Sequence, residues 1–326
     1  MKFGFSLLML GVLLSAQTQA QTFCVFDMVG AQGPVISGMR EYTTQSRAWG
    51  AQLDLRPYTS ERVAAEDFKA GQCDAVLLTG MRARQFNHFT GSIDSIGGLP
   101  NYTQLKLLMA ALLRPDASKL MTSGQYEVAG LMPLGAAYIF LRDRNINTVT
   151  KMAGRKIAVL DYDKAQLVMA ERIGAQTIMS DVSNFAGKFN NGQVDATAAP
   201  AVAYMPLELY KGVGSQGAAL KMPVAQLTFQ MLIRPDKFPA GFGQRSREHF
   251  YGQYDTAMKT VSAAEDDILF FFPPADGTAP QYREMMRQAR ISMTKQGIYH
   301  PQMMNLMKKI RCRAEPTQAE CSDNLE

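Results

Sequence analysis

The chain has 326 residues, of which 47% are hydrophobic and 19% are charged, and its formal net charge at pH 7 is +5. These proportions exclude an intrinsically disordered chain, which would carry more charge and fewer apolar groups, and the length suffices for two domains. The basic residues are scattered rather than gathered into a stripe with aromatic side chains, so we expect no nucleic-acid partner.

The first 20 residues have the pattern of a cleavable signal peptide. Lys2 supplies a positive charge, an apolar run follows over residues 5–14, and Thr18-Gln19-Ala20 places small residues where a signal peptidase reads them. The run is too short to span a bilayer, and no later segment is long and apolar enough. We therefore predict cleavage after Ala20 and a periplasmic protein that is not itself embedded in the membrane.

Four cysteines allow three disulfide pairings. Cys24 lies in the first predicted strand of the exported chain, Cys73 opens a later strand of the same region, and Cys312 and Cys321 are neighbours near the C-terminus. We predict the pairs Cys24–Cys73 and Cys312–Cys321, which suit an oxidising compartment. No pair has C-x-x-C spacing and no histidine adjoins one, so no metal site is expected.

The predicted elements of residues 21–141 alternate between strand and helix. In chain order they are strand 23–26, helix 35–49, strand 53–56, helix 61–70, strand 75–78 and helix 105–113. This β-α-β-α-β series predicts a parallel sheet with right-handed crossovers, which we call lobe 1. Two apolar runs within 127–141, split by Met132-Pro133-Leu134-Gly135, are expected to be strands that leave lobe 1.

Lobe 2 is expected over residues 142–226, with the same alternation. Its predicted elements are strand 156–160, helix 163–172, strand 177–179, helix 185–191, strand 194–199 and helix 202–211. Asp163 is expected to cap the helix that it begins, with Gln166 completing a capping box. Residues 227–265 return to lobe 1, starting with a strand over 227–233 and continuing into a helix over 247–265.

Residues 266–326 are expected to form C-terminal helices and a tail held by the second disulfide. The helices are predicted over 281–295 and 302–310. On the last of these, Met303, Met304 and Met307 lie on one face with His300, and we interpret this stripe as apolar packing rather than a copper site.

Two repeats relate the predicted lobes. The pattern F-x-x-G-Q-x-D-A begins at Phe68 and again at Phe189, and Cys24-Val25-Phe26-Asp27 matches Ala158-Val159-Leu160-Asp161. Ligands of open parallel sheets bind outside the carboxyl ends of the strands. The repeats therefore point to four loops around a shared cleft, namely 27–33, 79–84, 161–163 and 197–204.

Residues 23–265 resemble the periplasmic solute-binding proteins of TRAP-type transporters. The resemblance rests on Gly98-Leu99-Pro100 before a helix, on residues 152–159, which are similar to the motif L-x-G-x-K-I-R-V, and on Gly192-Gln193-Val194-Asp195-Ala196 followed by Pro200. It implies an α/β fold of the two-lobed type II periplasmic binding protein kind, with a ligand cleft between the lobes and C-terminal helices.

The resemblance also implies a function. Such a protein captures a small-molecule ligand, closes by a hinge motion, here expected near Leu141 and Leu227, and delivers the ligand to inner-membrane permease subunits. The alternative is a periplasmic accessory protein of an efflux or envelope-sensing system on the same fold. No enzyme and no cofactor are expected, because there is no G-x-S-x-G elbow, phosphate loop or H-E-x-x-H motif. A second alternative is an enzyme on this scaffold that uses Asp27 and Asp161 as paired carboxylates.

One position departs from the resembled family and bears on the ligand. The family's arginine, which clamps a substrate carboxylate, would stand at Ala158, and Thr197, Ala198 and Ala199 replace polar residues usual before the proline. We therefore expect a neutral, cationic or partly apolar ligand rather than a simple carboxylate.

The candidate binding residues lie mainly on the four loops. Asp27 and Asp161 have two open interpretations, as ligands for an amine or polyhydroxylated solute or as caps on backbone amides. The aromatic candidates either stack on the ligand or pack in the core. The full set of candidates is Asp27, Met28, Gln32, Thr79, Met81, Arg82, Tyr138, Asp161, Tyr162, Ala199, Tyr204 and Phe229.

Overall fold

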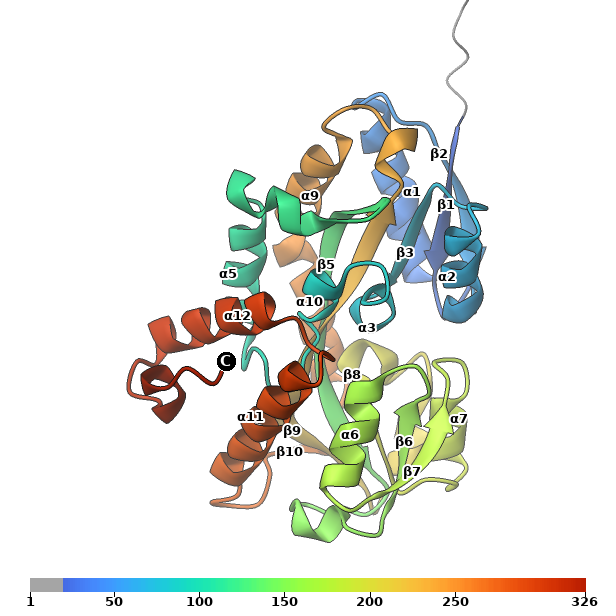
Figure 1. The fold of residues 1–326 in the computed structure, drawn as a ribbon. Helices are drawn as coiled ribbons and strands as arrows, with labels where there is room; N and C mark the ends of the chain where they lie inside the picture. The colour runs from blue at the N-terminus through green and yellow to red at the C-terminus, as the bar shows by residue number, and fades with distance from the viewer. Residues whose placement is uncertain (1–19) are drawn as a thin grey trace, which may run out of the picture.

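The computed structural model describes residues 20–326, so residues 1–19 of the predicted signal peptide lie outside the described residues. The protein has two α/β lobes joined by two long strands, with helices of the C-terminal region lying beside them (Figure 1). The ten strands of residues 20–326 belong to one sheet, whose main path runs β2-β1-β3-β9-β5-β8-β6-β7. The α/β fold class predicted from the sequence is confirmed.

Lobe 1 is built around a parallel arrangement of its first three strands. Its elements are β1 (Gln21–Phe26), α1 (Pro34–Arg47), β2 (Leu53–Tyr58), α2 (Glu61–Lys69), β3 (Ala75–Thr79), α3 (Gly80–Ala83), α4 (His88–Gly91), α5 (Tyr102–Leu112), a 3-10 helix (Pro115–Met121) and β4 (Thr122–Ser123). β1 pairs in parallel with both β2 and β3, as the β-α-β-α-β series predicts. The aromatic rings of Phe23, Phe26 and Phe68 are fully buried in its core.

Two long strands connect the lobes. They are β5 (Tyr126–Leu141) and β9 (Ala218–Ile233). The prediction of two separate strands within 127–141 is wrong: the pairing continues through Pro133 and Gly135 with register shifts. A bulge tolerates both a proline, which has no N–H, and a glycine with positive φ, here +95°.

The point where β5 changes lobes lies earlier than Leu141. Residues Ala137–Leu141 already pair with β8 of lobe 2, whereas Phe229–Ile233 of β9 pair with β3 of lobe 1. The chain therefore passes between the lobes at Pro133–Ala137 on β5, and opposite this on β9, where Leu227 pairs with Gly135.

Lobe 2 repeats the parallel arrangement on a smaller scale. Its elements are a 3-10 helix (Thr150–Met152), β6 (Lys156–Leu160), α6 (Lys164–Arg172), β7 (Gln176–Ser180), α7 (Phe185–Asn190), β8 (Ala196–Pro200), a 3-10 helix (Ala201–Ala203) and α8 (Leu209–Val213). β6 pairs in parallel with β7 and β8. The prediction of a helix over 202–211 is wrong, because Pro206 interrupts it and Glu208 has a φ of 54°, so that α8 begins only at Leu209.

Within the described residues, the C-terminal region contributes a short strand, four α-helices and two 3-10 helices. They are a 3-10 helix (Pro235–Lys237), α9 (Phe242–Gly252), α10 (Tyr254–Asp266), β10 (Phe271–Phe272), α11 (Ala279–Lys295), α12 (Pro301–Ala314) and a 3-10 helix (Ala319–Ser322). The single helix predicted over 247–265 is two helices that meet at Gln253. α11 lies against α6 of lobe 2, and α12 lies against α5 of lobe 1 (Figure 1).

Both predicted disulfides are present. Cys24 and Cys73 join β1 to the start of β3, and Cys312 and Cys321 join α12 to the tail. Across residues 20–326, no helix has the length and apolar character needed to cross a membrane.

The repeated F-x-x-G-Q-x-D-A pattern has the same structural role in both lobes. The Asp74 carboxylate accepts a hydrogen bond from the backbone N–H of Thr22 at 2.9 Å, and the Asp195 carboxylate accepts one from Lys156 at 2.8 Å. Each aspartate therefore holds the start of the first strand of its lobe. The repeat therefore has a structural role. In each lobe it lies at the ends of the strands that face away from the cleft.

Two arginines extend this equivalence. Arg142 follows β5 and donates to the carbonyl of Phe189 at the end of α7, while Arg234 follows β9 and donates to the carbonyl of Phe68 at the end of α2. A cation at a helix C-terminus satisfies carbonyls that have no partner within the helix. The two lobes therefore share the same helix-end contact as well as the same strand-start contact.

Candidate ligand-binding site

A pocket of about 200 Å³ lies between the two lobes. On the lobe 1 side it is lined by residues at the carboxyl ends of β1 and β3, including Met28, Thr79 and Met81. This is the edge of the sheet that the two repeats indicated, because parallel strands end together there.

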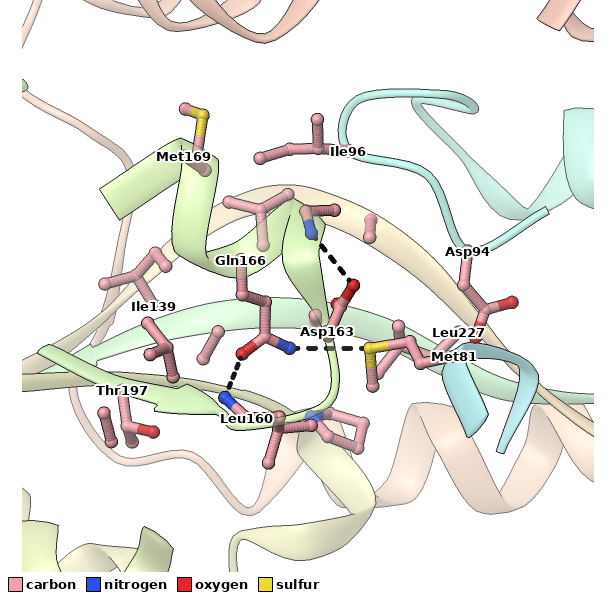
Figure 2. Close-up of a pocket in the computed structure, with 18 of the residues that line it drawn as sticks. Met81, Asp94, Ile96, Ile139, Leu160, Asp163, Gln166, Met169, Thr197 and Leu227 are labelled. Atoms are coloured by element: carbon pink, nitrogen blue, oxygen red, sulfur yellow. Dashed lines mark hydrogen bonds between the residues drawn. The ribbon is translucent and has the colours of Figure 1, made fainter. Parts of the chain in front are cut away.

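Lobe 2 supplies a larger share of the wall. The inner face of β6, including Ala158, faces the pocket together with Ala198 of β8 and Met169 of α6. Figure 2 shows Gln166 on α6 between Thr197 on one side and Met81 on the other.

The remaining wall comes from the strands that join the lobes and from the C-terminal region. Leu134 and Ala137 of β5, Leu227 of β9, and Met285 and Met286 of α11 all line the pocket. The pocket is thus also lined by the segments that join the two lobes.

The chemistry of the lining is apolar. Across the part of the chain that the structure describes, the pocket is lined by no lysine, arginine or histidine, and its charged lining residues are Asp94 and Asp163. A buried carboxylate ligand needs a cation or several N–H donors to replace its water. Within residues 20–326, the pocket lining offers no cationic side chain for such a ligand.

Both acids are buried, and Asp94 is bound to a single residue of β9. Its carboxylate accepts hydrogen bonds from the Thr228 hydroxyl at 2.7 Å and the Thr228 backbone N–H at 3.1 Å. Burial raises the pKa of the Asp94 carboxyl to about 7, and these hydrogen bonds only partly oppose that shift.

Asp163 caps α6, as predicted, by accepting from the backbone N–H of Ala165 at 3.1 Å. The predicted capping box is wrong, because the Gln166 side chain does not reach back to Asp163. It accepts instead from the N–H of Leu160 at 2.9 Å and donates to the sulfur of Met81 at 3.5 Å. Gln166 therefore joins lobe 2 to lobe 1 across the pocket (Figure 2).

Further contacts between the lobes surround Tyr162. Its hydroxyl donates to the Glu61 carboxylate at 3.1 Å, and the Arg82 guanidinium lies 3.3 Å from its ring centroid. Arg82 also lies 3.5 Å from Glu61 and 3.8 Å from Asp181. Burial raises the pKa of the Glu61 carboxyl and raises the pKa of the Tyr162 hydroxyl well above its usual value.

Arg84 makes the shortest ion pair between the lobes. Its guanidinium lies 3.0 Å from the Asp163 carboxylate and donates to the carbonyl of Gly91 at 3.0 Å. Both side chains of the ion pair are largely buried. We call the contacts of Glu61, Arg82, Arg84, Tyr162 and Asp163 the lobe latch.

Four of the predicted binding residues line the pocket and two belong to the lobe latch. Those in the pocket are Met28, Thr79, Met81 and Phe229. Those in the latch are Arg82 and Tyr162. Their contact with a ligand remains a prediction.

The two aspartate candidates have different surroundings. Asp27 is fully buried and accepts from the backbone N–H groups of Val29, Val35 and Ile36 at 2.8–3.0 Å, so it caps α1. Asp161 is exposed and does not line the pocket, and the candidate Gln32 is exposed as well. The structure therefore does not bring Asp27 and Asp161 together.

The remaining candidates pack away from the pocket. The Tyr138 hydroxyl donates to Glu265 at 2.7 Å, and Ala199 pairs with Tyr138 on the neighbouring strand. Tyr204 stacks on Phe140 with ring centroids 5.8 Å apart. The sequence left open whether these aromatic rings stack on the ligand or pack in the core. In the structure they pack in the core.

Asp94 and the pocket-lining residues of α11 were not among the binding residues predicted from the sequence. Asp94 lies between Ile93 and Ile96, outside either repeat, and a charged residue in an otherwise apolar segment was the available signal. Met285 and Met286 were expected within a helix, but nothing local indicated that this helix covers the pocket.

The fold is similar to that of solved TRAP periplasmic solute binding proteins. The protein from Desulfovibrio salexigens with bound orotic acid has 15% sequence identity and a TM-score of 0.75, over 90% of this chain and 99% of that chain. The protein from Sulfitobacter sp. NAS-14.1 with bound β-D-galacturonate has 14% identity and a TM-score of 0.70, over 90% and 99% of the two chains. The fold is thus the two-lobed fold of TRAP periplasmic solute-binding proteins.

Sequence relatives are closer. "Probable solute-binding protein AdeT1" of Acinetobacter baumannii is 43% identical over 304 residues, which cover 93% of this chain and all of that protein. "Probable solute-binding protein AdeT2" of the same organism is 26% identical over 233 residues, covering 71% of this chain and 98% of that protein. The chain belongs to the family "Solute-binding protein AdeT 1/2", which it matches over residues 39–326.

Proposed function

We propose that this protein captures a small, largely apolar molecule in the periplasm, holds it between its two lobes and delivers it to permease subunits in the inner membrane. The observation that carries the proposal is the pocket between the lobes, whose walls are apolar and, within residues 20–326, include no cationic side chain. Apolar walls with a few polar groups are typical of small-molecule sites.

The choice of solute differs from that of the structural neighbours. Those neighbours hold organic acids such as orotic acid and galacturonate. In this chain Ala158 lines the pocket at the position where the resembled family has its clamping arginine. A carboxylate placed here would lose its water without gaining a cation, which favours a neutral or cationic solute.

Capture would proceed by closure of the lobes about β5 and β9. The lobe latch and the contact of Gln166 with Met81 join the lobes around the pocket. Because these contacts exist only when the lobes are together, a solute that touches both lobes adds to the stability of the closed form. The closed form would then be the one that a permease recognises.

Export to the periplasm is part of the proposal. The two disulfides are consistent with an oxidising compartment, and the predicted signal peptide would bring the chain there. The mass of the protein purified from a periplasmic extract should correspond to a chain that begins at Gln21. A mass that includes Met1 would contradict cleavage.

Native mass spectrometry of freshly purified protein tests the binding function. The wild-type protein should carry a non-covalent solute, and Ala198→Trp should lose it because the indole fills the pocket. Ala31→Trp, at an exposed position in the loop after β1, is the matched control and should keep the solute.

If the protein is purified empty, a thermal-unfolding screen over apolar alcohols, amines, sugars and carboxylates replaces that measurement. A solute that binds only the native state raises the melting temperature, and Ala198→Trp should abolish the rise. Stabilisation by carboxylates alone, or an equal response of Ala198→Trp, would contradict the proposal.

A further inference from the structure

We propose that the solute is an amine with an apolar body and that Asp94 binds its ammonium group. The inference rests on the proposed function above, since it assumes that the pocket between the lobes is the solute site. Asp94 would select the ammonium head group of the solute, and the apolar walls would select its apolar body.

Asp94 lines the pocket, and each of its carboxylate oxygens accepts one hydrogen bond from Thr228. The Asp94 side chain is 4% exposed, and its carboxylate accepts these hydrogen bonds from the hydroxyl and the backbone N–H of Thr228. Within residues 20–326 no lysine, arginine or histidine nitrogen lies within ion-pair distance of it. A carboxylate in such surroundings is costly to ionise unless a cation joins it.

The other acid of the pocket already has its cation. Asp163 lies 3.0 Å from Arg84, and Asp163 also accepts from the N–H of Ala165. Arg84 therefore balances Asp163, which leaves Asp94 as the pocket carboxylate without a directly paired positive charge. The ammonium group of a bound solute would neutralise the charge of the Asp94 carboxylate.

The absence of a side chain at Gly80 leaves room for the Asp94 carboxylate. Gly80 begins α3, and a Cβ at that position would collide with both the Asp94 carboxylate and the Thr228 hydroxyl. Figure 2 shows Asp94 at the margin of the pocket, on the side of Met81 and Leu227. The apolar body of the solute would extend from there toward Ile139 and Thr197.

The pKa of Asp94 agrees with this geometry. Burial raises it to about 7, the Thr228 hydrogen bonds and the charge of Arg84 oppose the rise, and the charge of Asp163 adds to it. Tyr299, on the loop before α12, also lines the pocket, and the Arg84 guanidinium lies 5.2 Å from its ring centroid. A bound ammonium group would lower the pKa of Asp94, so a proton and an amine would compete for this carboxylate.

A series of three six-carbon compounds tests the head group. n-Hexylamine, 1-hexanol and hexanoate share an apolar chain and differ in charge, and their affinities are measured by calorimetry at pH 8. We expect the amine to bind about tenfold or more tightly than the alcohol, as is usual for a hydrogen bond to a charged group, and hexanoate not to bind detectably.

Two aspartate variants assign the effect to one residue. Asp94→Asn keeps the size and one acceptor oxygen but removes the charge, so it should bind hexylamine no more tightly than hexanol. Asp161→Asn makes the same chemical change at an exposed position of lobe 2 and should retain the full preference for the amine.

The pH dependence of the wild-type protein tests the same point if Asp94→Asn does not fold. Between pH 8 and pH 5 hexylamine remains protonated, whereas Asp94 takes up a proton. Its affinity should therefore fall, approaching about tenfold for each pH unit well below the pKa, while the affinity of hexanol stays nearly constant.

The outcomes separate this inference from the function on which it rests. Equal binding of amine and alcohol, a retained preference in Asp94→Asn, or no loss of amine affinity at low pH would overturn the role of Asp94 and leave an apolar solute site. If none of the three compounds binds, both the inference and the apolar solute site fail. Preferential binding of hexanoate would overturn both as well.

Discussion

Lobe 1 and lobe 2 are alike at the ends of their sheets that face away from the pocket and different at the ends that face it. Asp74 and Asp195 hold their first strands in the same way, and Arg234 and Arg142 bind the ends of equivalent helices. At the pocket, lobe 1 places Thr79 and Met81 at and after the end of β3, whereas lobe 2 places small residues and Pro200 in and after β8.

This comparison separates scaffold from site. A sequence repeat marks what both lobes need in order to fold, and so it identifies the sheet edge but not the residues that select a solute. The solute-selecting residues are to be sought where the lobes differ. Asp94, Ala158 and the face of α6 are such places.

The largest expected effect concerns the disulfide that lobe 2 lacks. Cys24 and Cys73 correspond in the repeats to Ala158 and Val194, so Cys24→Ala with Cys73→Val gives lobe 1 the residues of lobe 2. We expect a loss of about 4 kcal/mol in the free energy of unfolding, since the bond closes a long loop. Urea unfolding measures this loss.

The tail disulfide is the control for that experiment. Cys312 and Cys321 are 9 residues apart, so Cys312→Ala with Cys321→Ala should cost about 1 kcal/mol less than the first pair. A larger loss from the tail pair would contradict the assignment of the main constraint to lobe 1.

Asp27 and Asp161 occupy matching positions with different roles. Asp27→Ala removes a buried carboxylate from three backbone N–H groups and should lower the free energy of unfolding by about 3 kcal/mol. Asp161→Ala, at an exposed position, should change it by less than about 0.5 kcal/mol. Similar losses in chemical denaturation would show that Asp161 is also a structural cap.

Ala158 is the position at which lobe 2 can be turned toward acids. Ala158→Arg places a guanidinium in the pocket wall, and we expect carboxylates to gain about 2 kcal/mol of binding free energy relative to the wild-type protein. Ala158→Met, which adds length without charge, should bring no such gain. Titration calorimetry with hexanoate distinguishes them, and an equal response of both variants would refute the charge argument.

The strand-start aspartates should behave alike. Asp74→Ala and Asp195→Ala each remove one hydrogen bond to a strand-start N–H, and each should cost about 1 kcal/mol. Thermal unfolding of the two variants checks the equality. If one is neutral and the other costs several times more, the structural equivalence of the lobes has no energetic counterpart.

The smallest effect is expected in the lobe latch. Tyr162→Phe removes the hydrogen bond to Glu61 but keeps the ring over Arg82, so solute affinity should fall by about twofold as the closed form loses roughly 0.5 kcal/mol. Tyr210→Phe, on the exposed side of lobe 2, is the control and should leave affinity unchanged. An increase in affinity for Tyr162→Phe would contradict a latch.

Much of the fold could be predicted because its signals are local. Alternating strand and helix patterns gave the order of elements, and the positions of the cysteines in the predicted strands led to the right pairs. The errors lie where neighbouring strands override a local signal, as at Pro133 and Gly135, whose pairing continues through register shifts. Pro206 is the opposite case, because here a local signal, the proline, interrupts a helix that the apolar spacing favoured.

The pocket was predictable to the extent that strand ends define it. Met28, Thr79, Met81 and Phe229 were found from their positions at strand ends or on the returning strand. Asp94 was not, because its importance comes from packing against Thr228, which lies 134 residues away in the chain. Contacts between such distant segments have no local signature.

We infer that the pocket between the lobes holds an apolar solute without a cationic clamp. A crystal structure of the protein with its co-purified or screened solute tests this most directly. We predict solute density enclosed by Met81 and Leu227 on one side and Thr197 on the other, with no arginine or lysine nitrogen within about 3.5 Å of it. Density at another site, or a solute carboxylate paired with an arginine, would contradict the account.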